Sequence, residues 1–285
     1  MMLAADVGSS EPTSPGAKAS PLAIVDGGKF KMLYDARQRP QSVLLHGRLF
    51  IVYNGDATPS KNGNGSAYPM IISYDSQSRA FTDPVRLGKK SSTDHHDSPI
   101  IWADEDDFLH VLFGCHKTPG THLISKQSVK RGTTAIQWTA APQVASKLSY
   151  PTAFRICGNR ELTYYRTDGH TSSWTYRISE DNGRTWKGPE DDVTDLDSRG
   201  RLDWSSYQTK LPSKDGKHLH VVYTDYDDNK YLPNPERFFN PRYNQLASNE
   251  WKYNLSYVKI NLETHEVRNA DGRVLKTPID IDYSK

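Results

Sequence analysis

The chain has 285 residues, a net charge of +2 and 35% apolar residues. The nearly balanced charge gives no large basic face, which argues against a nucleic-acid-binding protein. No stretch approaches 18 apolar residues, which argues against a membrane-spanning helix.

The beginning of the chain differs in composition from the rest. Residues 1–25 are rich in Ser, Pro, Ala and Gly without periodicity, so we expect a disordered lead-in. Residues 1–5 are too short for the apolar core of a signal peptide, and no signal peptide is recognisable in this sequence. A cytosolic protein, or an exported one whose leader is missing, would both fit. We expect residues 26–285 to form a single domain.

A strand–turn–strand pattern begins after residue 30 and then recurs. Apolar runs at residues 43–45 and 49–53 flank a turn, and similar units begin at Ser98, at Tyr150 and near Trp204. The period is roughly fifty residues, with about four short strands in each unit and almost no helical periodicity. The aromatic content of 11% suits such strands, an ordinary β core and carbohydrate platforms alike.

The pattern predicts an all-β fold, a β-propeller of four-stranded antiparallel blades with about four units. Four units leave open a truncated or a smaller propeller. Residues 229–250 interrupt the fourth unit, and we expect them to cross one face and to line a site.

One local motif is specific. It is the Asp-box, Ser-x-Asp-x-Gly-x-Thr-Trp, formed by Ser179, Asp181, Gly183, Thr185 and Trp186. The Ser and Asp side chains can bond the backbone of a turn, Gly permits a positive φ, and Trp can pack beneath. The motif indicates a propeller blade. Because Asp-boxes usually sit away from the active face, we expect these residues to be structural.

Two histidines flank a predicted hairpin. Its strands, residues 100–103 and 108–113, are joined by an acidic turn at residues 104–107, which we expect to be solvated. A hairpin brings the start of its first strand beside the end of its second, so His96 and His116 should meet there. Whether His95 or His96 faces a cleft stays open, because only one of two neighbours in a strand can.

A second pair follows the same logic. Tyr150 opens the third unit and Arg166 ends the next predicted strand, sixteen residues later, so they should also share one sheet end. Neighbouring propeller blades present equivalent strand ends to a common face. We therefore expect His96, His116, Tyr150 and Arg166 to converge near the central channel.

These residues resemble a family. The runs around His96, His116, Tyr150 and Arg166 are similar to the propeller polysaccharide lyases that cut ulvan, within the wider set of Asp-box (BNR-type) proteins that includes rhamnose–glucuronate lyases. The resemblance covers residues 35–280. It implies a lyase that cleaves a uronic-acid-containing polysaccharide by β-elimination. The family's propellers usually have seven blades, and this sequence shows four units.

The resemblance also implies roles. His96 would take a proton, Tyr150 would supply one, and Arg166 with His116 would hold the uronate carboxylate. We add four candidate substrate-binding residues, His95, Tyr165, Arg177 and Tyr207. Tyr165 alternates with Tyr164 along a strand, so a place in the core stays open for it.

Such chemistry requires no redox cofactor and no metal ion, so we expect no metal ligands in the site. We expect an acidic polysaccharide as the partner, a monomer, and a secreted or periplasmic location. His95, His96, Cys115 and His116 are metal-ligand types without tight zinc spacing. A structural calcium ion at residues 104–107, or a zinc ion, therefore stays an alternative that no spacing in the sequence supports. Cys115 and Cys157 either form a disulfide or are small residues of strand ends.

Two other functions compete with the lyase. A non-catalytic carbohydrate-binding propeller suits the short length. A sialidase-like glycoside hydrolase also carries Asp-boxes, and Arg155 between Phe154 and Ile156 faintly matches its arginine motif. We expect His122, His170 and His220 to be surface or wall residues.

Overall fold

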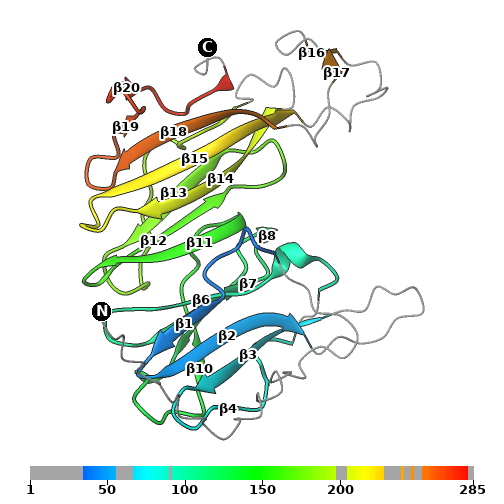
Figure 1. The fold of residues 1–285 in the computed structure, drawn as a ribbon, viewed down its shortest axis with the longest axis vertical. Helices are drawn as coiled ribbons and strands as arrows, with labels where there is room; N and C mark the ends of the chain where they lie inside the picture. The colour runs from blue at the N-terminus through cyan, green and yellow to red at the C-terminus, as the bar shows by residue number, and fades with distance from the viewer. Residues whose placement is uncertain are drawn as a thin grey trace, which may run out of the picture.

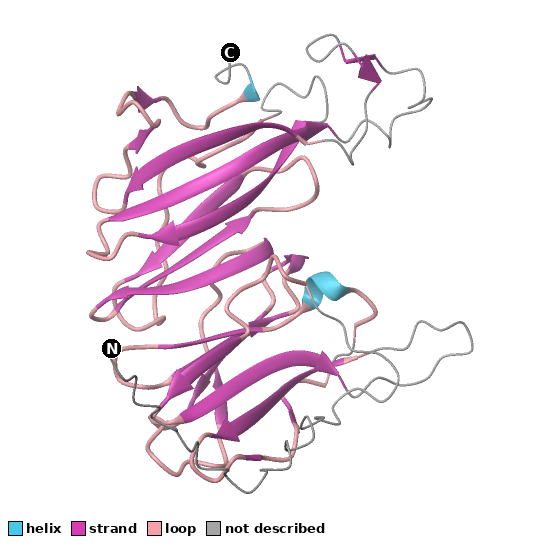
Figure 2. Cartoon of the chain, in the orientation of Figure 1, coloured by secondary structure: helices cyan, strands magenta, loops and turns pink. Residues whose placement is uncertain are grey.

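The computed structural model describes residues 35–55, 67–89, 92–196, 204–227, 239–240, 245–246 and 252–281. Within these ranges the chain forms strands, turns and loops and one short 3₁₀ helix, η1 (His95–Asp97) (Figure 2). No helix in the described part is long and apolar enough to cross a bilayer. The expected lead-in and most of residues 229–250 lie outside the described residues; only β16 (Phe239–Asn240) and β17 (Gln245–Leu246) are placed there.

Four large antiparallel sheets follow one another along the chain (Figure 1). The first contains β1 (Ser42–Leu45), β2 (Arg48–Gly55), β3 (Tyr68–Asp75), β4 (Ala80–Phe81) and β5 (Val85–Arg86). The second contains β6 (Ile100–Ala103), β7 (Leu109–Phe113), β9 (Thr121–Ser125) and β10 (Trp138–Ala140). The third contains β8 (His116–Thr118), β11 (Leu148–Cys157), β12 (Arg160–Arg166) and β13 (Trp174–Ser179). The fourth contains β14 (Trp204–Pro212), β15 (His218–Asp227), β18 (Tyr253–Asn261), β19 (Val267–Arg268) and β20 (Val274–Leu275).

The all-β propeller prediction is confirmed, with one correction to the blades. The second and third sheets have four strands, whereas the first and fourth carry a fifth. In the first sheet β5 pairs with β3 at Met70↔Arg86, beyond the short β4. In the fourth, β20 is added outside β19. Both additions are two-residue strands, too short to leave a pattern in the sequence.

One strand of the third sheet, β8, lies in the chain between two strands of the second sheet, β7 and β9. β7 ends at Phe113, as predicted, and Gly114 (φ +72°) then turns the chain out of the sheet. His116 then begins β8, which pairs with β11, before the chain returns to the second sheet at β9. His116 thus lies where the two blades meet, not at the end of the hairpin's second strand as predicted.

The first described residues tie three blades together. The backbone of Arg39 exchanges hydrogen bonds with Pro151 and Ala153 of β11, at 3.2 and 2.9 Å. The carbonyl of Pro40 accepts from Ile101 of β6, and that of Gln41 accepts from Val52 of β2. Residues 35–41, which we call the N-terminal segment, are therefore hydrogen-bonded to the first, second and third blades.

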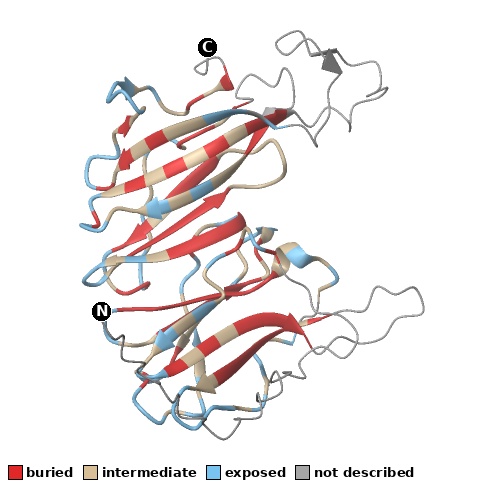
Figure 3. Cartoon of the chain, viewed as in Figure 1, coloured by how far each residue is buried: buried red, intermediate tan, exposed pale blue. Residues whose placement is uncertain are grey.

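Apolar side chains fill the space between neighbouring sheets, and the buried residues of Figure 3 follow the strands. One cluster joins the first and second blades and includes Phe50, Ile101 and Val111. Another joins the third and fourth and includes Trp174, Leu219 and Ile260. Burial of this kind, rather than intrinsic strand preference, sets the register of each sheet.

The Asp-box forms the turn that its sequence predicts. Asp181 Oδ1 accepts from the backbone N–H groups of Arg184 and Thr185 at 3.1 and 2.7 Å, and Ser179 Oγ accepts from that of Gly183. The neighbouring Asn182 donates to Asp106 Oδ2 in the turn of the second blade, at 2.8 Å. The motif is structural, and in this protein it also fastens the third blade to the second.

The acidic turn at residues 104–107 is not simply solvated. Asp104 is buried and accepts from the backbone of Asp106 and Phe108, and its Oδ2 lies 3.4 Å from His110 Nε2. His110 Nδ1 in turn contacts His122 Nε2 at 3.1 Å. Burial lowers the pKa of His122 to about 3, so His122 is neutral. The expectation that His122 is a surface or wall residue is wrong, because both histidines belong to a buried network between blades.

Substituting Gly183 should test this junction. Its φ is +72°, and a Cβ there would lie 2.8 Å from His110 Cε1 and 2.9 Å from Glu161 Oε2. We expect Gly183→Ala to lower the free energy of unfolding by about 2–4 kcal/mol in denaturant titrations. Gly158 is the matched control, since it also has positive φ but open space at its Cβ position. Gly158→Ala should cost about 1 kcal/mol; equal losses would contradict the packing argument.

Candidate active site

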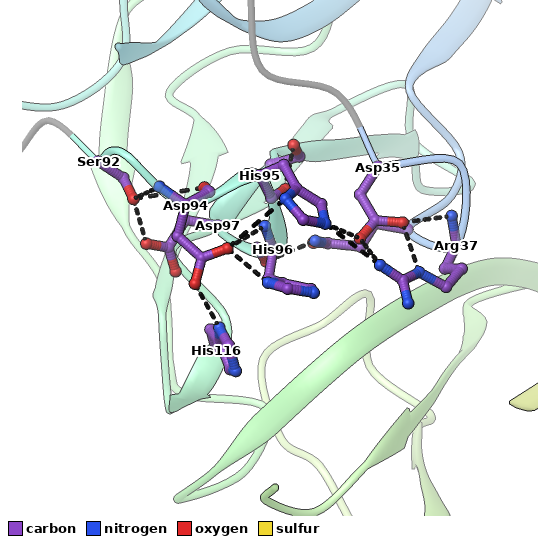
Figure 4. A network of polar contacts seen from close by, with 10 residues as sticks. Asp35, Arg37, Ser92, Asp94, His95, His96, Asp97 and His116 are labelled. Atoms are coloured by element: carbon purple, nitrogen blue, oxygen red, sulfur yellow. Dashed lines mark hydrogen bonds and ion pairs between the residues drawn. The ribbon is translucent and has the colours of Figure 1, made fainter. Parts of the chain in front are cut away.

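Asp94 organises the two predicted histidines. It precedes η1 and caps it, accepting the backbone N–H of His96 at 2.9 Å. Its Oδ1 also contacts His96 Nδ1, and its Oδ2 contacts His116 Nδ1 at 2.8 Å (Figure 4). The two imidazole centroids are 4.5 Å apart. The prediction that His96 and His116 meet is confirmed, and the carboxylate between them was missed.

This contact fixes which ring nitrogens carry protons. Backbone and histidine hydrogen bonds, which outweigh partial burial, lower the pKa of Asp94 to about 2, so it is ionised. An ionised carboxylate only accepts, so Nδ1 of each imidazole donates. When His96 is neutral, its Nε2 then carries a lone pair. Burial lowers the pKa of His96 below its ordinary 6.5, against the pull of Asp94, which favours the neutral base.

The third sheet places the other two candidates beside these histidines. Ser149 of β11 pairs with His116 of β8 on one side and with Arg166 of β12 on the other. Paired positions on neighbouring strands are about 4.8 Å apart, so these three residues form one row across the sheet. The register shifts between Ser149 and Thr152, and Tyr150 there has a φ of +54°. A bulge of this kind redirects a side chain, and strained backbone of this type is often found at functional sites.

Tyr150 is the centre of the cluster. Its ring centroid lies 5.2 Å from that of His96 and 6.0 Å from that of Tyr207. Arg166 Cζ lies 4.6 Å from the ring centroid and Arg37 Cζ 4.3 Å. Burial raises the pKa of the Tyr150 hydroxyl well above 10, and the two guanidinium groups offset this only in part. The phenol is therefore protonated at neutral pH and able to donate a proton.

Arg166 is deeper than expected. It is 0% exposed, and none of its three side-chain nitrogens has a hydrogen-bond partner among the described residues. It makes a cation–π contact with Tyr150. Burial, and after it the charge of Arg166, lowers the pKa of His170 to about 4. A buried, unpaired cation costs several kcal/mol, and no hydrogen bond to a described residue offsets this cost for Arg166.

Two site residues were missed because they come from the N-terminal segment. Asp35 is buried and receives Nε and Nη2 of Arg37 at 2.8 and 2.6 Å. Arg37 also approaches His95 Nε2 at 3.3 Å (Figure 4). The amide of Gln38 donates to the carbonyl of His96. Residues 35–38 and residue 96 do not belong to one predicted hairpin, so sequence spacing could not bring them together. The sequence showed only that strand-like patterning begins after residue 30.

Two of the four candidate substrate-binding residues lie at the cluster. His95 is half-exposed, with Nε2 3.5 Å from Asp35, and its ring centroid is 3.9 Å from that of His96. Tyr207 stacks on Tyr226 with 5.0 Å between ring centroids.

The other two lie elsewhere. Tyr165 is buried among Trp102, Leu148 and Ala153, in the core between the second and third blades. Arg177 of β13 pairs with Thr163 of β12. Thr163 is three positions from Arg166 along β12, a separation of about 10 Å. Neither residue lies at the cluster, and their assignment to substrate binding stays a prediction, because alternation along a strand does not tell which face is open.

Several alternatives can also be placed. Arg155 lies beside Asp104 and Glu105, at the far end of β6 from His96, which removes the sialidase-like motif from the cluster.

Cys115 is buried and Cys157 is exposed, and both are free thiols. Two groups offer metal-ligand atoms within 4.8 Å of one another, Asp35–His95–His96 and Asp94–His96–His116. The expectation of chemistry without a metal ion therefore stays a prediction.

The sequence matches known proteins. A profile of the BNR repeat-containing family matches residues 64–285. The chain belongs to this family. This BNR family member is 22% identical to an ulvan lyase of Alteromonas sp. (strain LOR), over 92% of its own length and 52% of the relative. It is 26% identical to "Ulvan Lyase-PL25" of Pseudoalteromonas sp. (strain PLSV), over 60% of its length and 34% of the relative. It thus spans about a third to a half of the curated relatives.

Solved structures share the fold. A PL25 ulvan lyase superposes with a TM-score of 0.69 at 21% identity, covering 92% of this BNR family member and 60% of that chain. The same enzyme "bound to -[GlcA(1-4)Rha3S]-" also gives 0.69, at 20% identity. Polysaccharide lyase Uly1 gives 0.59 at 13% identity. These likenesses support the propeller architecture.

Proposed function

We propose that this protein is a polysaccharide lyase that cleaves a uronic-acid-containing, ulvan-like polysaccharide by β-elimination. The observation that carries the proposal is the surroundings of Tyr150. A neutral histidine paired with a carboxylate lies on one side of this protonated phenol, and a buried guanidinium without a hydrogen-bond partner lies against it. A base, an acid and a cation for the substrate carboxylate are the three groups that this reaction needs.

Each group has one task in the proposed reaction. His96 Nε2 takes the C5 proton of the uronate, and the electron pair of that C–H bond forms the C4–C5 double bond. The C4–O bond breaks, and the departing oxygen takes the hydroxyl proton of Tyr150. Arg166 binds the carboxylate and stabilises the negative charge that develops on it. His116, whose Nδ1 donates to Asp94, adds a hydrogen bond to the carboxylate as an imidazolium, in which Nε2 also carries a proton. Asp94 holds His96 in the tautomer that leaves Nε2 free, and it accepts the Nδ1–H of His116.

The balance of this reaction requires neither water nor an added cofactor, so we propose chemistry without a metal ion. A polymer of this size cannot cross a cell membrane unaided, so we extend the proposal to a secreted or periplasmic location. We also propose that the protein acts as a monomer.

Incubating the protein with ulvan and other glucuronate polymers tests the function. Unsaturated uronate absorbs in the ultraviolet, and absorbance should rise with time; a folded sample that gives no rise on any uronate polymer would refute the proposal.

The pH dependence of kcat/KM should follow from the two shifted groups. The base must be neutral, and the pKa of His96 lies below 6.5, so activity should fall only below pH 6.5. The acid must be protonated, and the pKa of Tyr150 lies above 10, so the alkaline limb should also lie above pH 10. Asp94→Asn removes an attraction that raises the pKa of His96. We expect the acid limb of this variant to move to lower pH, with a reduced plateau; a move to higher pH would contradict the assignment of His96 as the base.

A further inference from the structure

Asp35 fixes the guanidinium group of Arg37, and one of its nitrogens, Nη1, makes no hydrogen bond to another described residue. Asp35 takes its Nε and Nη2, and His95 lies near Nη2. The side chain is 37% exposed, whereas Asp35 behind it is 3% exposed. Its guanidinium carbon lies 4.3 Å from the ring centroid of Tyr150 and 5.1 Å from that of Tyr207. A guanidinium fixed by a buried carboxylate and two aromatic rings has little rotamer entropy left to lose on binding.

Arg37 also lines a cavity beside the cluster. A cavity of about 710 Å³ is lined by the N-terminal segment and by residues of β1, β6, β11 and β14. Arg37 belongs to this lining, and His96, His116, Tyr150 and Arg166 do not. Arg39 and Arg155 also line the cavity, Arg155 with Glu105 3.5 Å away, and no acidic side chain is among its described lining residues. Lys210 lines it too, and burial lowers the pKa of this amine to about 7. An anionic group leaving the cluster in this direction would enter a positive environment.

We infer that Arg37 binds a second anionic substituent of the substrate, a sulfate ester or a carboxylate on a sugar next to the uronate that undergoes elimination. The inference rests on the lyase function proposed above and adds a determinant of substrate choice to it. Arg166 and Arg37 contact the same tyrosine ring, so two oxyanions on adjacent sugars can be bound together. The planar fork of a guanidinium group suits sulfate and carboxylate oxygens alike.

Steady-state kinetics of Arg37→Ala and Arg37→Lys on sulfated and chemically desulfated ulvan tests this. We expect Arg37→Ala to raise KM about tenfold to a hundredfold, the loss typical of a hydrogen bond to a charged group. Arg37→Lys should recover part of that loss, because it keeps the charge but not the fork. Arg86→Ala is the matched control: Arg86 also lies on a tyrosine ring, 4.0 Å from the centroid of Tyr68, and its loss should leave KM unchanged.

The substrates distinguish the two anions. A KM increase confined to the sulfated polymer assigns a sulfate ester, and an equal increase on both polymers assigns a neighbouring carboxylate. A fall in kcat with unchanged KM would overturn the inference, because Arg37 would then only hold Tyr150 in position. Should Arg37→Ala misfold, Asp35→Asn keeps the guanidinium but releases it, and KM should again rise.

Calorimetric titration with sulfated oligosaccharides separates this inference from the lyase function, because binding needs no turnover. Weaker binding by Arg37→Ala, in a protein that forms no unsaturated product, would leave the inference standing and remove the lyase. Unchanged binding by Arg37→Ala, in a protein that does form product, would remove the inference alone.

Discussion

Replacing Arg166 by methionine is expected to stabilise the protein while lowering kcat/KM on its polysaccharide about 10²–10³-fold. The guanidinium is 0% exposed and has no hydrogen-bond partner among the described residues, so the free protein keeps a buried charge at a cost. Exchange of buried charged groups for apolar side chains of similar volume is often stabilising, by about 1–4 kcal/mol. The catalytic loss has the size typical of removing one electrostatic contact to a developing negative charge.

Thermal unfolding and kinetics should be measured on the same preparations. Arg268→Met is a suitable control, because Arg268 of β19 is half-exposed and its side chain pairs with that of Glu266 at 2.6 Å. Its loss should change stability by no more than about 0.5 kcal/mol and activity not at all. An Arg166→Met protein that melts earlier than the unchanged protein, or keeps its activity, would show that Arg166 is a structural cation rather than a carboxylate-binding one.

His96→Ala should lower kcat about 10²–10⁴-fold, the range for loss of a general base, with little change in substrate affinity. The side chain faces Asp94 through Nδ1 and contacts the ring of Tyr150. Binding should survive because Arg166 and Arg37 remain. Rates from product absorbance and affinities from calorimetry, both on intact ulvan fragments, give the two numbers.

A histidine outside the cluster supplies the comparison. His46 lies in the turn between β1 and β2, is exposed, and pairs with Asp107 at 2.8 Å. His46→Ala should retain full turnover. A carbohydrate-binding propeller without catalysis predicts a different result, in which neither substitution changes a rate because none is present, and in which His96→Ala loses only contact energy.

The residue pattern along the chain predicted the strands well, but it predicted less well which residues those strands contact. Strand alternation and the fifty-residue period were enough to predict the propeller, and hairpin geometry brought His96 to His116 and Tyr150 to Arg166. Alternation could not decide that Tyr165 faces the core, because both faces of a propeller blade are covered. The three-residue β8 is too short to carry a period, so the crossing that places His116 beside Ser149 was not predicted.

The missed residues share a physical reason. Asp35 and Arg37 reach the site through backbone pairing of the N-terminal segment with β11 and β6, a tertiary contact across more than fifty residues. Asp94 was visible beside the histidines, but a carboxylate two residues from one imidazole and 22 from the other shows its role only once β8 is placed.

The most direct test of the account is the structure of the product. Oligosaccharides released from ulvan should be separated and examined by mass spectrometry and proton NMR. Elimination adds no water, so each product should be lighter by one water than the corresponding hydrolysis fragment. Its new non-reducing end should show the vinyl proton of a C4–C5 double bond. Fragments with saturated uronate ends and the mass of added water would contradict the account, because the cluster around Tyr150 would then perform hydrolysis.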